Sequence, residues 1–248
     1  MSDAAPQLEL GLHGHRELNR LDPAMWRGSF TARESSMHQL APYVGKMKSG
    51  MARALLQAYS GEGDTVLDPF CGSGVVPYEA LLLRRNAIAN DLNPYAYVLT
   101  MGKLTAPITE REALERAAHF MDQAERAKTS VDLDRLPDWV RQFFDPETLK
   151  ETLALFQLLR QHNEYFFQAC TLGILHHVRP GFLSYPASHL VPYLRRNMYP
   201  PQKYPGMYRY RAVRPRFLAK IRRSYRRYTA VDSSLRWYVL QQNAMHLS

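Results

Sequence analysis

Residues 68–74 (DPFCGSG) have the composition of a ligand-binding turn between a strand and a helix. Gly72 and Gly74 lack a Cβ, so the backbone there can turn sharply and approach a ligand closely. The helix that follows offers free N–H groups and a positive dipole end to an anionic group. Asp68 can accept a hydrogen bond from an amine of the same ligand, directly or through water. The turn therefore predicts a site for a small ligand that carries an anion and an amine.

A second acidic residue, Asp91, follows Asp68 by 23 positions, at the end of the next expected strand. By the logic of dinucleotide sites, a carboxylate at this place can hold both hydroxyls of a ribose. A lone Gly-x-Gly would be weak support, because about half of such fragments are plain strand-to-helix turns without a ligand. The glycines together with Asp91 predict a ligand that contains a ribose.

A β-α-β unit is needed to position these residues, and the surrounding sequence has that pattern. Residues 49–59 (SGMARALLQAY) place apolar side chains at helical spacing, and Gly61 and Gly63 end that helix. Residues 65–68 (TVLD) predict a short buried strand, residues 75–85 a helix with an apolar face, and residues 86–91 (NAIAND) a second strand. The unit has the expected length of about 30 residues.

Farther along the chain, two helices have recognisable N-terminal caps. Thr109 and Glu112 form a capping box, and Asp145 followed by Pro146 has the residue types that begin a helix. The prolines between residues 180 and 215 forbid long helices, so that stretch is expected to be extended. The expected elements are helices at residues 110–128, 146–162, 165–178 and 216–228, and the start of a strand within 231–240.

The motifs closely resemble those of the amino-directed DNA methyltransferases, which methylate cytosine N4 or adenine N6 with S-adenosylmethionine. DPFCGSG resembles motif I, residues 90–94 (NDLNP) resemble the second cofactor-binding motif, and residues 38–46 (HQLAPYVGK) resemble motif X, which closes over the methionine end of the cofactor. The resemblance implies an α/β fold with the Rossmann-like sheet of a class I methyltransferase. It assigns these residues to the cofactor site: Tyr43, Lys46, Asp68, Phe70, Gly72, Ser73, Gly74, Asp91 and Asn93.

The family activates the base amine with a loop of the type (Asp, Asn or Ser)-Pro-Pro-(Tyr, Phe or Trp), whose aromatic ring stacks on a flipped base. The only Pro-Pro of this chain, at residues 200–201, has the wrong residue on both sides. We therefore assign no catalytic residue and expect an incomplete sheet. We expect the cofactor-binding half of an enzyme that is either truncated or paired with a second polypeptide that supplies the loop.

The charge is concentrated in one segment. The chain has a net charge of +9, but residues 165–231 contain 13 Lys or Arg and no Asp or Glu, so the remainder is slightly acidic. This asymmetry indicates a polyanionic partner, here DNA, whose phosphates arginines would neutralise and whose bases tyrosines would stack on. The expected nucleic-acid contacts are Arg195, Arg196, Arg209, Arg211, Arg214, Arg216, Arg222 and Arg223.

These observations divide the chain into three expected parts. Residues 1–105 form the cofactor-binding α/β part, residues 106–230 a helical and Pro/Tyr/Arg-rich insert for target recognition, and residues 231–248 the start of the return to the sheet. We expect a cytoplasmic protein of DNA methylation or restriction-modification. Two alternatives stay open, namely a tRNA methyltransferase, since some carry a similar DPFCG motif, and a non-catalytic module that binds cofactor and DNA.

Membrane and metal partners are not expected. No stretch approaches 18 apolar residues, as a membrane-spanning helix would require. The two cysteines, Cys71 and Cys170, can form neither a disulfide framework nor a four-cysteine zinc site. Adjacent His176 and His177 lack the spacing of two ligands on one helix face.

Overall fold

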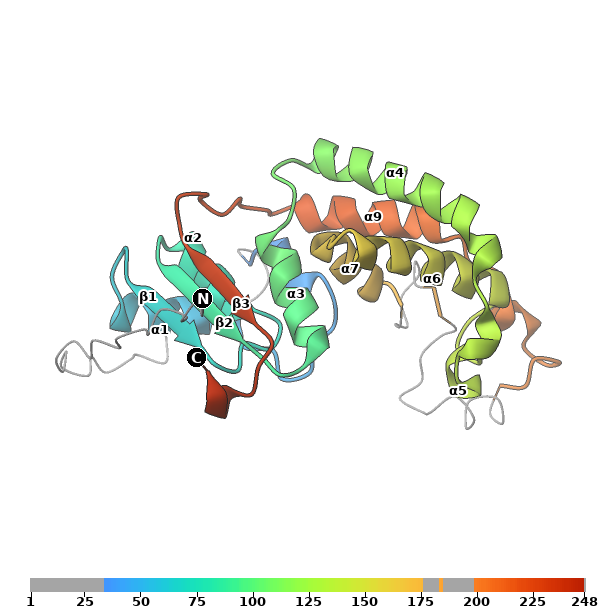
Figure 1. Ribbon diagram of the computed structural model, residues 1–248, viewed down its shortest axis with the longest axis horizontal. Coiled ribbons are helices and arrows are strands. Elements are labelled where there is room, and N and C mark those ends of the chain that lie inside the picture. Colours follow the sequence, from blue (N-terminus) through green and yellow to red (C-terminus); the bar gives the residue numbers. More distant parts are fainter. Residues whose placement is uncertain (1–33, 176–182, 185–198, 248) are drawn as a thin grey trace, which may run out of the picture. The chain divides into compact units, whose positions relative to one another are not determined.

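The computed structural model describes residues 34–175, 183–184 and 199–247, which fall into two compact units (Figure 1). The first unit contains Tyr43–Met101 and the described part of Thr229–Ser248. The second contains Ser35–Pro42 and the described part of Gly102–Tyr228. Among the described residues, no helix is both long and apolar enough to cross a membrane, and no cluster of His, Cys, Asp or Glu could hold a metal ion.

The first unit is built on a parallel sheet in the order β1-β2-β3 (Figure 1). The strands are β1 (Thr65–Asp68), β2 (Asn86–Asn90) and β3 (Trp237–Leu240). The expected strand at 65–68 is confirmed, the second ends one residue before its expected end, and the third occupies only the last part of 231–240. The mixed α/β architecture with a three-stranded sheet confirms the expectation of an incomplete Rossmann-like fold.

Helices α1 (Ser49–Tyr59) and α2 (Val75–Leu82) pack against each other, and α2 contacts both β1 and β2. Helix α1 has its expected bounds, but α2 ends three residues before the expected 85. The reason lies at Arg84, whose φ of 64° is left-handed and turns the chain toward β2. The carbonyl of Arg84 then accepts a hydrogen bond from Gly63 N at 2.9 Å, which fixes that turn beside the start of β1.

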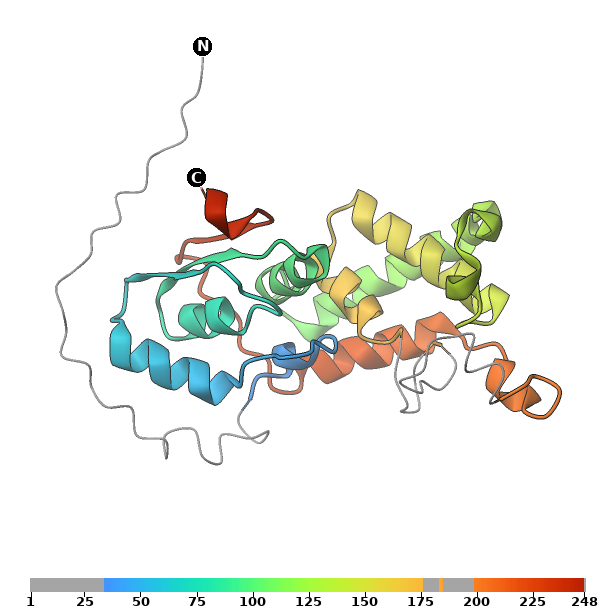
Figure 2. The same cartoon turned by 90° about the horizontal axis from the view of Figure 1, so that it is seen from below.

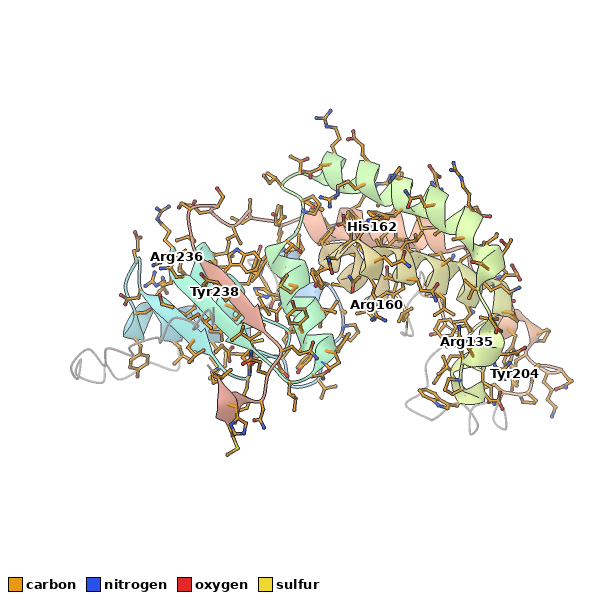
Figure 3. All side chains as sticks on the ribbon, viewed as in Figure 1. Arg135, Arg160, His162, Tyr204, Arg236 and Tyr238 are labelled. Atoms are coloured by element: carbon orange, nitrogen blue, oxygen red, sulfur yellow. The ribbon has the colours of Figure 1, made fainter. Side chains whose placement is uncertain are left out.

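One face of the sheet is open within the described part of the chain. Leu67, Ile88 and Tyr238 are aligned across the three strands, and successive residues of a strand point to opposite faces. Leu67 is 44% exposed and Tyr238 is 61% exposed, whereas Ala87 and Ala89 on the other face are buried. Figure 3 labels Tyr238 on β3. Parallel sheets are usually covered on both faces, whereas this row is exposed within the described residues.

The second unit is helical, and its helices run alongside one another in Figures 1 and 2. Helix α4 contacts α6 and α9, and α7 contacts α6 and α9. Its core is aromatic, with the Phe167 ring 6.2 Å from Phe120 and 6.1 Å from Phe217. The elements are η2 (Ser36–Gln39), α4 (Glu110–Ala127), η3 (Lys128–Ser130), η4 (Leu133–Arg135), α5 (Asp138–Arg141), α6 (Pro146–Gln161), α7 (Tyr165–Leu172), η5 (Pro205–Tyr208) and α9 (Val213–Tyr225).

Both expected helix caps are confirmed. The Thr109 side chain accepts a hydrogen bond from Glu112 N at 3.2 Å, and α4 begins at the next residue. The Asp145 carboxylate accepts one from Thr148 N at 3.0 Å at the start of α6. Each bond satisfies a backbone N–H that has no partner within the helix, which is why these sequences begin helices where they do.

Other expected bounds were wrong in detail. The basic helix α9 begins at Val213 rather than 216, because Pro215 falls in the first turn, where a missing N–H costs nothing. It ends at Tyr225, before the expected 228. Helix α7 ends at Leu172, well before 178. Most of the expected extended stretch 180–215 and the N-terminal residues 1–33 lie outside the described residues.

The segment Ser35–Pro42 packs with the second unit, whereas the sequence placed it in the cofactor-binding part. Ser36 Oγ donates a hydrogen bond to the carbonyl of Ser224 at 2.6 Å, and Lys220 Nζ donates one to the carbonyl of Gln39 at 2.5 Å. These bonds attach η2 to α9, more than 180 positions away in the sequence. The stretch that resembles motif X is therefore shared, with its first residues in one unit and Tyr43 onward in the other.

Candidate functional site

A cavity of about 370 Å³ lies beside the turn between β1 and α2 in the first unit. Its size falls in the usual range for small-molecule sites. Its walls include six of the nine residues assigned to the cofactor from the sequence, and also the unassigned Met47, Leu67, Cys71, Val75 and Val76. The six are Tyr43, Lys46, Asp68, Phe70, Gly72 and Ser73.

The glycine turn has the left-handed backbone that the sequence required. Gly72 has a φ of 51° and Gly74 a φ of 71°, a region that side chains with a Cβ rarely adopt. The turn is closed by a hydrogen bond from Gly74 N to the carbonyl of Cys71 at 2.8 Å. It is also joined to β2, since Cys71 N donates to the carbonyl of Asn90 at 2.9 Å. The backbone of the turn is therefore fixed before any ligand binds.

Gly74 is the N-cap of α2 and faces α3 (Pro94–Leu104) rather than the cavity. A Cβ on Gly74 would lie 2.5 Å from Thr100 Oγ1 and 2.9 Å from Thr100 Cα. Thr100 Oγ1 also donates a hydrogen bond to the carbonyl of Gly72 at 3.3 Å. Gly74 thus permits close packing of α3 on the turn, and Thr100 is a residue of the site that sequence patterns missed.

Asp91 lies directly beside the glycine turn. Its Oδ2 accepts a hydrogen bond from Gly72 N at 2.9 Å, and its Oδ1 accepts one from Asn93 N at 2.9 Å. Asn93 Oδ1 in turn accepts from Tyr95 N at 2.9 Å, at the start of α3. The assigned residues Asp91 and Asn93 therefore connect the end of β2 to the turn, at the place expected for a carboxylate that holds ribose hydroxyls.

Tyr43 covers Gly72. A Cβ built on Gly72 would lie 3.0 Å from Tyr43 Cε1 and 3.3 Å from its hydroxyl oxygen. Burial raises the pKa of the Tyr43 hydroxyl, and the nearby Asp91 carboxylate and Cys71 add to the effect. Tyr43 also stacks on Tyr95, with ring centroids 6.0 Å apart and an interplanar angle of 13°. Lys46, three residues on, is half-buried and lines the same cavity.

Asp68 presents a carboxylate to the cavity at the end of β1. Burial raises the pKa of Asp68. The backbone N–H of Phe70, which donates to Asp68 Oδ1 at 3.2 Å, lowers this pKa, and the charge of Asp91 raises it. The Phe70 side chain is 77% exposed. A partly desolvated carboxylate is a strong acceptor for a ligand amine, because few water molecules compete for it.

Asn90 is another residue that the sequence did not single out. Its Nδ2 donates to the carbonyls of Pro69 at 3.1 Å and of Gln242 at 3.0 Å, and its Oδ1 accepts from Gln242 N at 3.0 Å. It thus binds the turn after β1 to the chain after β3. Only its place beside Asp91 in the motif NDLNP could have suggested a role.

Taken together, the cavity and the residues beside it could hold a ligand that carries both an amine and a ribose. The half-buried carboxylate of Asp68 could accept a hydrogen bond from an amine, and the carboxylate of Asp91 at the end of β2 could accept hydrogen bonds from ribose hydroxyls. The turn with Gly72 brings bare backbone to the cavity wall, and the ring of Tyr43 closes over it. A cofactor that joins an amino acid to a nucleoside needs these two kinds of contact at opposite ends.

The arginines expected to contact nucleic acid lie in different surroundings. Two of them, Arg195 and Arg196, lie outside the described residues. Arg214 pairs with Asp122, and Arg216 Nη1 donates to the carbonyl of Ala212 at 2.8 Å. Arg211 is half-buried, and its backbone N–H bonds to a threonine of α6. The exposed members are Arg209, Arg222 and Arg223. Arg226 and Arg227, which directly follow α9, are exposed as well.

Several tyrosines of the basic segment serve the fold. Tyr225 OH donates to the carbonyl of Pro107 at 2.7 Å, and its ring lies 5.7 Å from that of Phe166. Tyr210 OH donates to Glu151 Oε1 at 2.6 Å, and burial together with this carboxylate raises the pKa of Tyr210 to about 12. The hydroxyls of Tyr210 and Tyr225 are therefore engaged within the helical unit, which gives the Tyr and Arg alternation a partly structural cause.

Comparison with known proteins shows similarity to DNA methyltransferases. A profile of the N6/N4 methyltransferase family, described as DNA methylase, matches residues 19–101. Type II methyltransferase M.BsoBI of Geobacillus stearothermophilus is 26% identical over 141 residues, which are 56% of this chain and 27% of the relative. Type II methyltransferase M.MjaII of Methanocaldococcus jannaschii is 24% identical over 136 residues, or 54% of this chain and 22% of the relative.

The chain thus spans about a quarter of the length of these two curated relatives. No solved structure matches it. The matched residues 19–101 include β1, β2, the glycine turn and every residue assigned above to the cofactor.

Proposed function

We propose that the chain belongs to the DNA methylase family of N6- and N4-methylating enzymes, binds S-adenosylmethionine and supplies the cofactor-binding part of a site-specific DNA methyltransferase. The observation that carries the proposal is the pairing of Asp91 with the glycine turn at the wall of the cavity. The target is the amino group of cytosine N4 or adenine N6.

Within the site, each residue has a distinct task. Asp68 accepts a hydrogen bond from the amine of the cofactor, and the N-terminal turn of α2 attracts its carboxylate. Asp91 holds the ribose hydroxyls, and Tyr43 covers the methionine end with Lys46 beside it. When bound, the cofactor supplies an electrophilic methyl group on a sulfonium. The chain's own residues hold that group in one orientation and exclude water from it.

The residues that activate the base amine are proposed to lie outside residues 1–248, on a second polypeptide or on a further part of a longer chain. The observation behind this is that no (Asp, Asn or Ser)-Pro-Pro-aromatic sequence occurs in them. Within the described part of the chain, β1 is an edge strand next to the cavity, and the row of Leu67 and Tyr238 is exposed. A further strand parallel to β1 and beside it would bring its carboxyl end to the same edge of the sheet as Asp68.

The exposed arginines of α9 and of the residues after it are proposed to bind DNA phosphates. Arg222, Arg223 and Arg226 are exposed and have no ion pair within the described residues. Val213, Phe217 and Ile221 of the same helix are buried, so α9 is fixed by its apolar face while its arginines meet solvent. Phosphate contacts of this kind position a protein on DNA without reading its sequence.

A tRNA substrate is the less favoured alternative, because both relatives are named type II methyltransferases. The same names suggest a role in restriction-modification. Methyl transfer to duplex DNA and to tRNA, measured side by side with a candidate partner present, separates the two substrates. Transfer to tRNA alone would overturn the DNA assignment.

The decisive experiment is calorimetry of the purified chain with S-adenosylmethionine, followed by a transfer assay with labelled cofactor and duplex DNA. We expect binding, abolished by Asp91→Ala, and no methyl transfer by the chain alone. Asp64→Ala is the matched control, because its carboxylate also accepts a glycine N–H, from Gly61 at 2.7 Å, but in a turn away from the cavity. Absence of binding to the wild-type chain would overturn cofactor binding, and robust transfer by the chain alone would overturn the need for a second polypeptide.

A further inference from the structure

A closed circuit of contacts links three segments around the glycine turn. Gly72 N donates to Asp91, Asn93 N donates to Asp91, and Tyr95 N donates to Asn93, each at 2.9 Å. The Tyr95 ring stacks on Tyr43, and the Tyr43 ring lies over Gly72, where the circuit began. This series of contacts therefore returns to the cofactor turn through Tyr95, a residue that does not line the cavity.

Tyr43 lies in an exposed part of the chain. Pro42 and Val44 on either side are exposed, Val44 being 99% exposed, and Gly45 has a left-handed φ of 77° with nothing within 4 Å of its Cβ position. Contacts of the Tyr43 ring therefore contribute to its position. These contacts include the cofactor turn at Gly72 and the ring of Tyr95.

Tyr95 is itself firmly anchored. It lies in the first turn of α3, its N–H is bonded to Asn93, and the next residue, Ala96, is fully buried. Burial, with a smaller contribution from Tyr43, raises the pKa of the Tyr95 hydroxyl to about 12, and a tyrosine is neutral at physiological pH even without this shift. A rigid neutral ring on a helix is a suitable support for a second ring on an exposed loop.

We propose that Tyr95 is a positioning residue for the cofactor site, which holds Tyr43 over Gly72 so that the wall of the cavity is formed before the cofactor arrives. The proposal rests on the function proposed above and extends it to a residue outside the pocket. Its physical basis is pre-organisation, because a loop that is already ordered loses less conformational entropy on binding. Stacked aromatic pairs contribute about 0.5–1.5 kcal/mol beyond their buried area, which corresponds to up to roughly ten-fold in affinity.

The test compares variants of the full chain by calorimetry with S-adenosylmethionine. We expect Tyr95→Ala to weaken binding by up to roughly ten-fold, and Tyr95→Phe, which keeps the ring, to restore it. Tyr97→Ala is the matched control, because Tyr97 is a half-buried tyrosine of the same helix that does not line the cavity. Tyr95→Leu keeps apolar volume without a ring, and it replaces Tyr95→Ala should that variant not fold.

A double-mutant cycle separates positioning from a general effect on the fold. If Tyr95 acts through Tyr43, then Tyr43→Ala with Tyr95→Ala binds no more weakly than Tyr43→Ala alone. Losses that simply add would overturn the proposal, as would equal affinity of Tyr95→Ala and the wild-type chain.

A second measurement does not need the cofactor. Hydrogen exchange of the backbone at residues 43–47 in the free chain should be faster in Tyr95→Ala than in wild type and unchanged in Tyr97→Ala. Unchanged exchange in Tyr95→Ala would overturn the positioning role even if the cofactor binds. Failure of the wild-type chain to bind, with faster exchange in Tyr95→Ala, would instead overturn the proposed function alone.

Discussion

The backbone N–H of Gly72 donates a hydrogen bond to Asp91 Oδ2 at 2.9 Å. This bond joins the turn after β1 to the residue that follows β2, so the carboxylate is fixed beside the cavity by the same backbone that forms the cavity wall. The second oxygen of Asp91 is occupied by Asn93 N. A ribose at this place would therefore meet a carboxylate whose orientation is already set.

The first prediction concerns the charge of Asp91. Asp91→Asn removes a charge-assisted acceptor, and we expect affinity for S-adenosylmethionine to fall about 10- to 100-fold, since hydrogen bonds to charged groups contribute about 1.5–3 kcal/mol. Calorimetry measures the affinity. The control is Asp64→Asn, which disturbs the Gly61 turn in the same way and should leave affinity unchanged. Equal losses in the two variants would mean that Asp91 acts only through the fold.

The second prediction concerns the two left-handed glycines Gly74 and Gly63. Gly74→Ala should destabilise the chain more than Gly63→Ala, because a Cβ on Gly74 meets Thr100 at 2.5 Å, whereas one on Gly63 meets nothing within 4 Å. The φ values of 71° and 83° are similar, so backbone strain of about 1–2 kcal/mol is common to both.

The difference between these two variants isolates the clash, for which we expect an additional 1–3 kcal/mol or so. Urea unfolding of both variants gives the two free energies of unfolding. Equal destabilisation would show that α3 can move away from the turn without cost, which would contradict close packing of Thr100 on Gly74.

The elements that local sequence patterns control were predicted well. Strand β1 has its expected bounds because a short apolar run is enclosed by glycine turns, and the caps at Thr109 and Asp145 were found because a cap is defined within four residues. The family motif led to the cavity for the same reason, since its glycines and Asp68 lie within seven residues of the sequence.

Contacts between distant residues could not be predicted in this way. Tyr43 and Tyr95 are 52 positions apart, and Ser36 and Ser224 are 188 positions apart. Neither pair forms a spacing of 2 or 3.6 residues, so periodicity has no means of detecting it. The role of Tyr95 and the packing of η2 on α9 therefore became visible only in three dimensions.

The third prediction concerns pH. Burial raises the pKa of Asp68 above its ordinary 3.8, while the Phe70 N–H opposes the shift. The ionised carboxylate is the form that binds a charged amine, and the amine keeps its charge below neutral pH. Affinity for S-adenosylmethionine should therefore fall as the pH is lowered, beginning at a higher pH than an exposed aspartate would show.

The effect of Asp68 on stability has the opposite sign. A carboxyl whose pKa is raised by folding stabilises the folded state while it is protonated, and that contribution is lost as the pH rises through the folded pKa. Calorimetry across a pH series, with Asp68→Asn as the comparison, measures the binding effect. A variant that keeps the full pH dependence of wild type would show that another group titrates.

The last prediction concerns the arginines of α9. Arg222→Ala with Arg223→Ala should weaken DNA binding and lower the slope of log affinity against log salt by about 1.8, because each phosphate contact contributes about 0.9. Both side chains are exposed without an ion pair in the described part of the chain, so they are available to phosphates. Arg141→Ala is the control, since Arg141 already pairs with Asp134 at 2.7 Å and with Asp138. It should leave the slope unchanged, and a double variant with the wild-type slope would show that DNA is bound elsewhere.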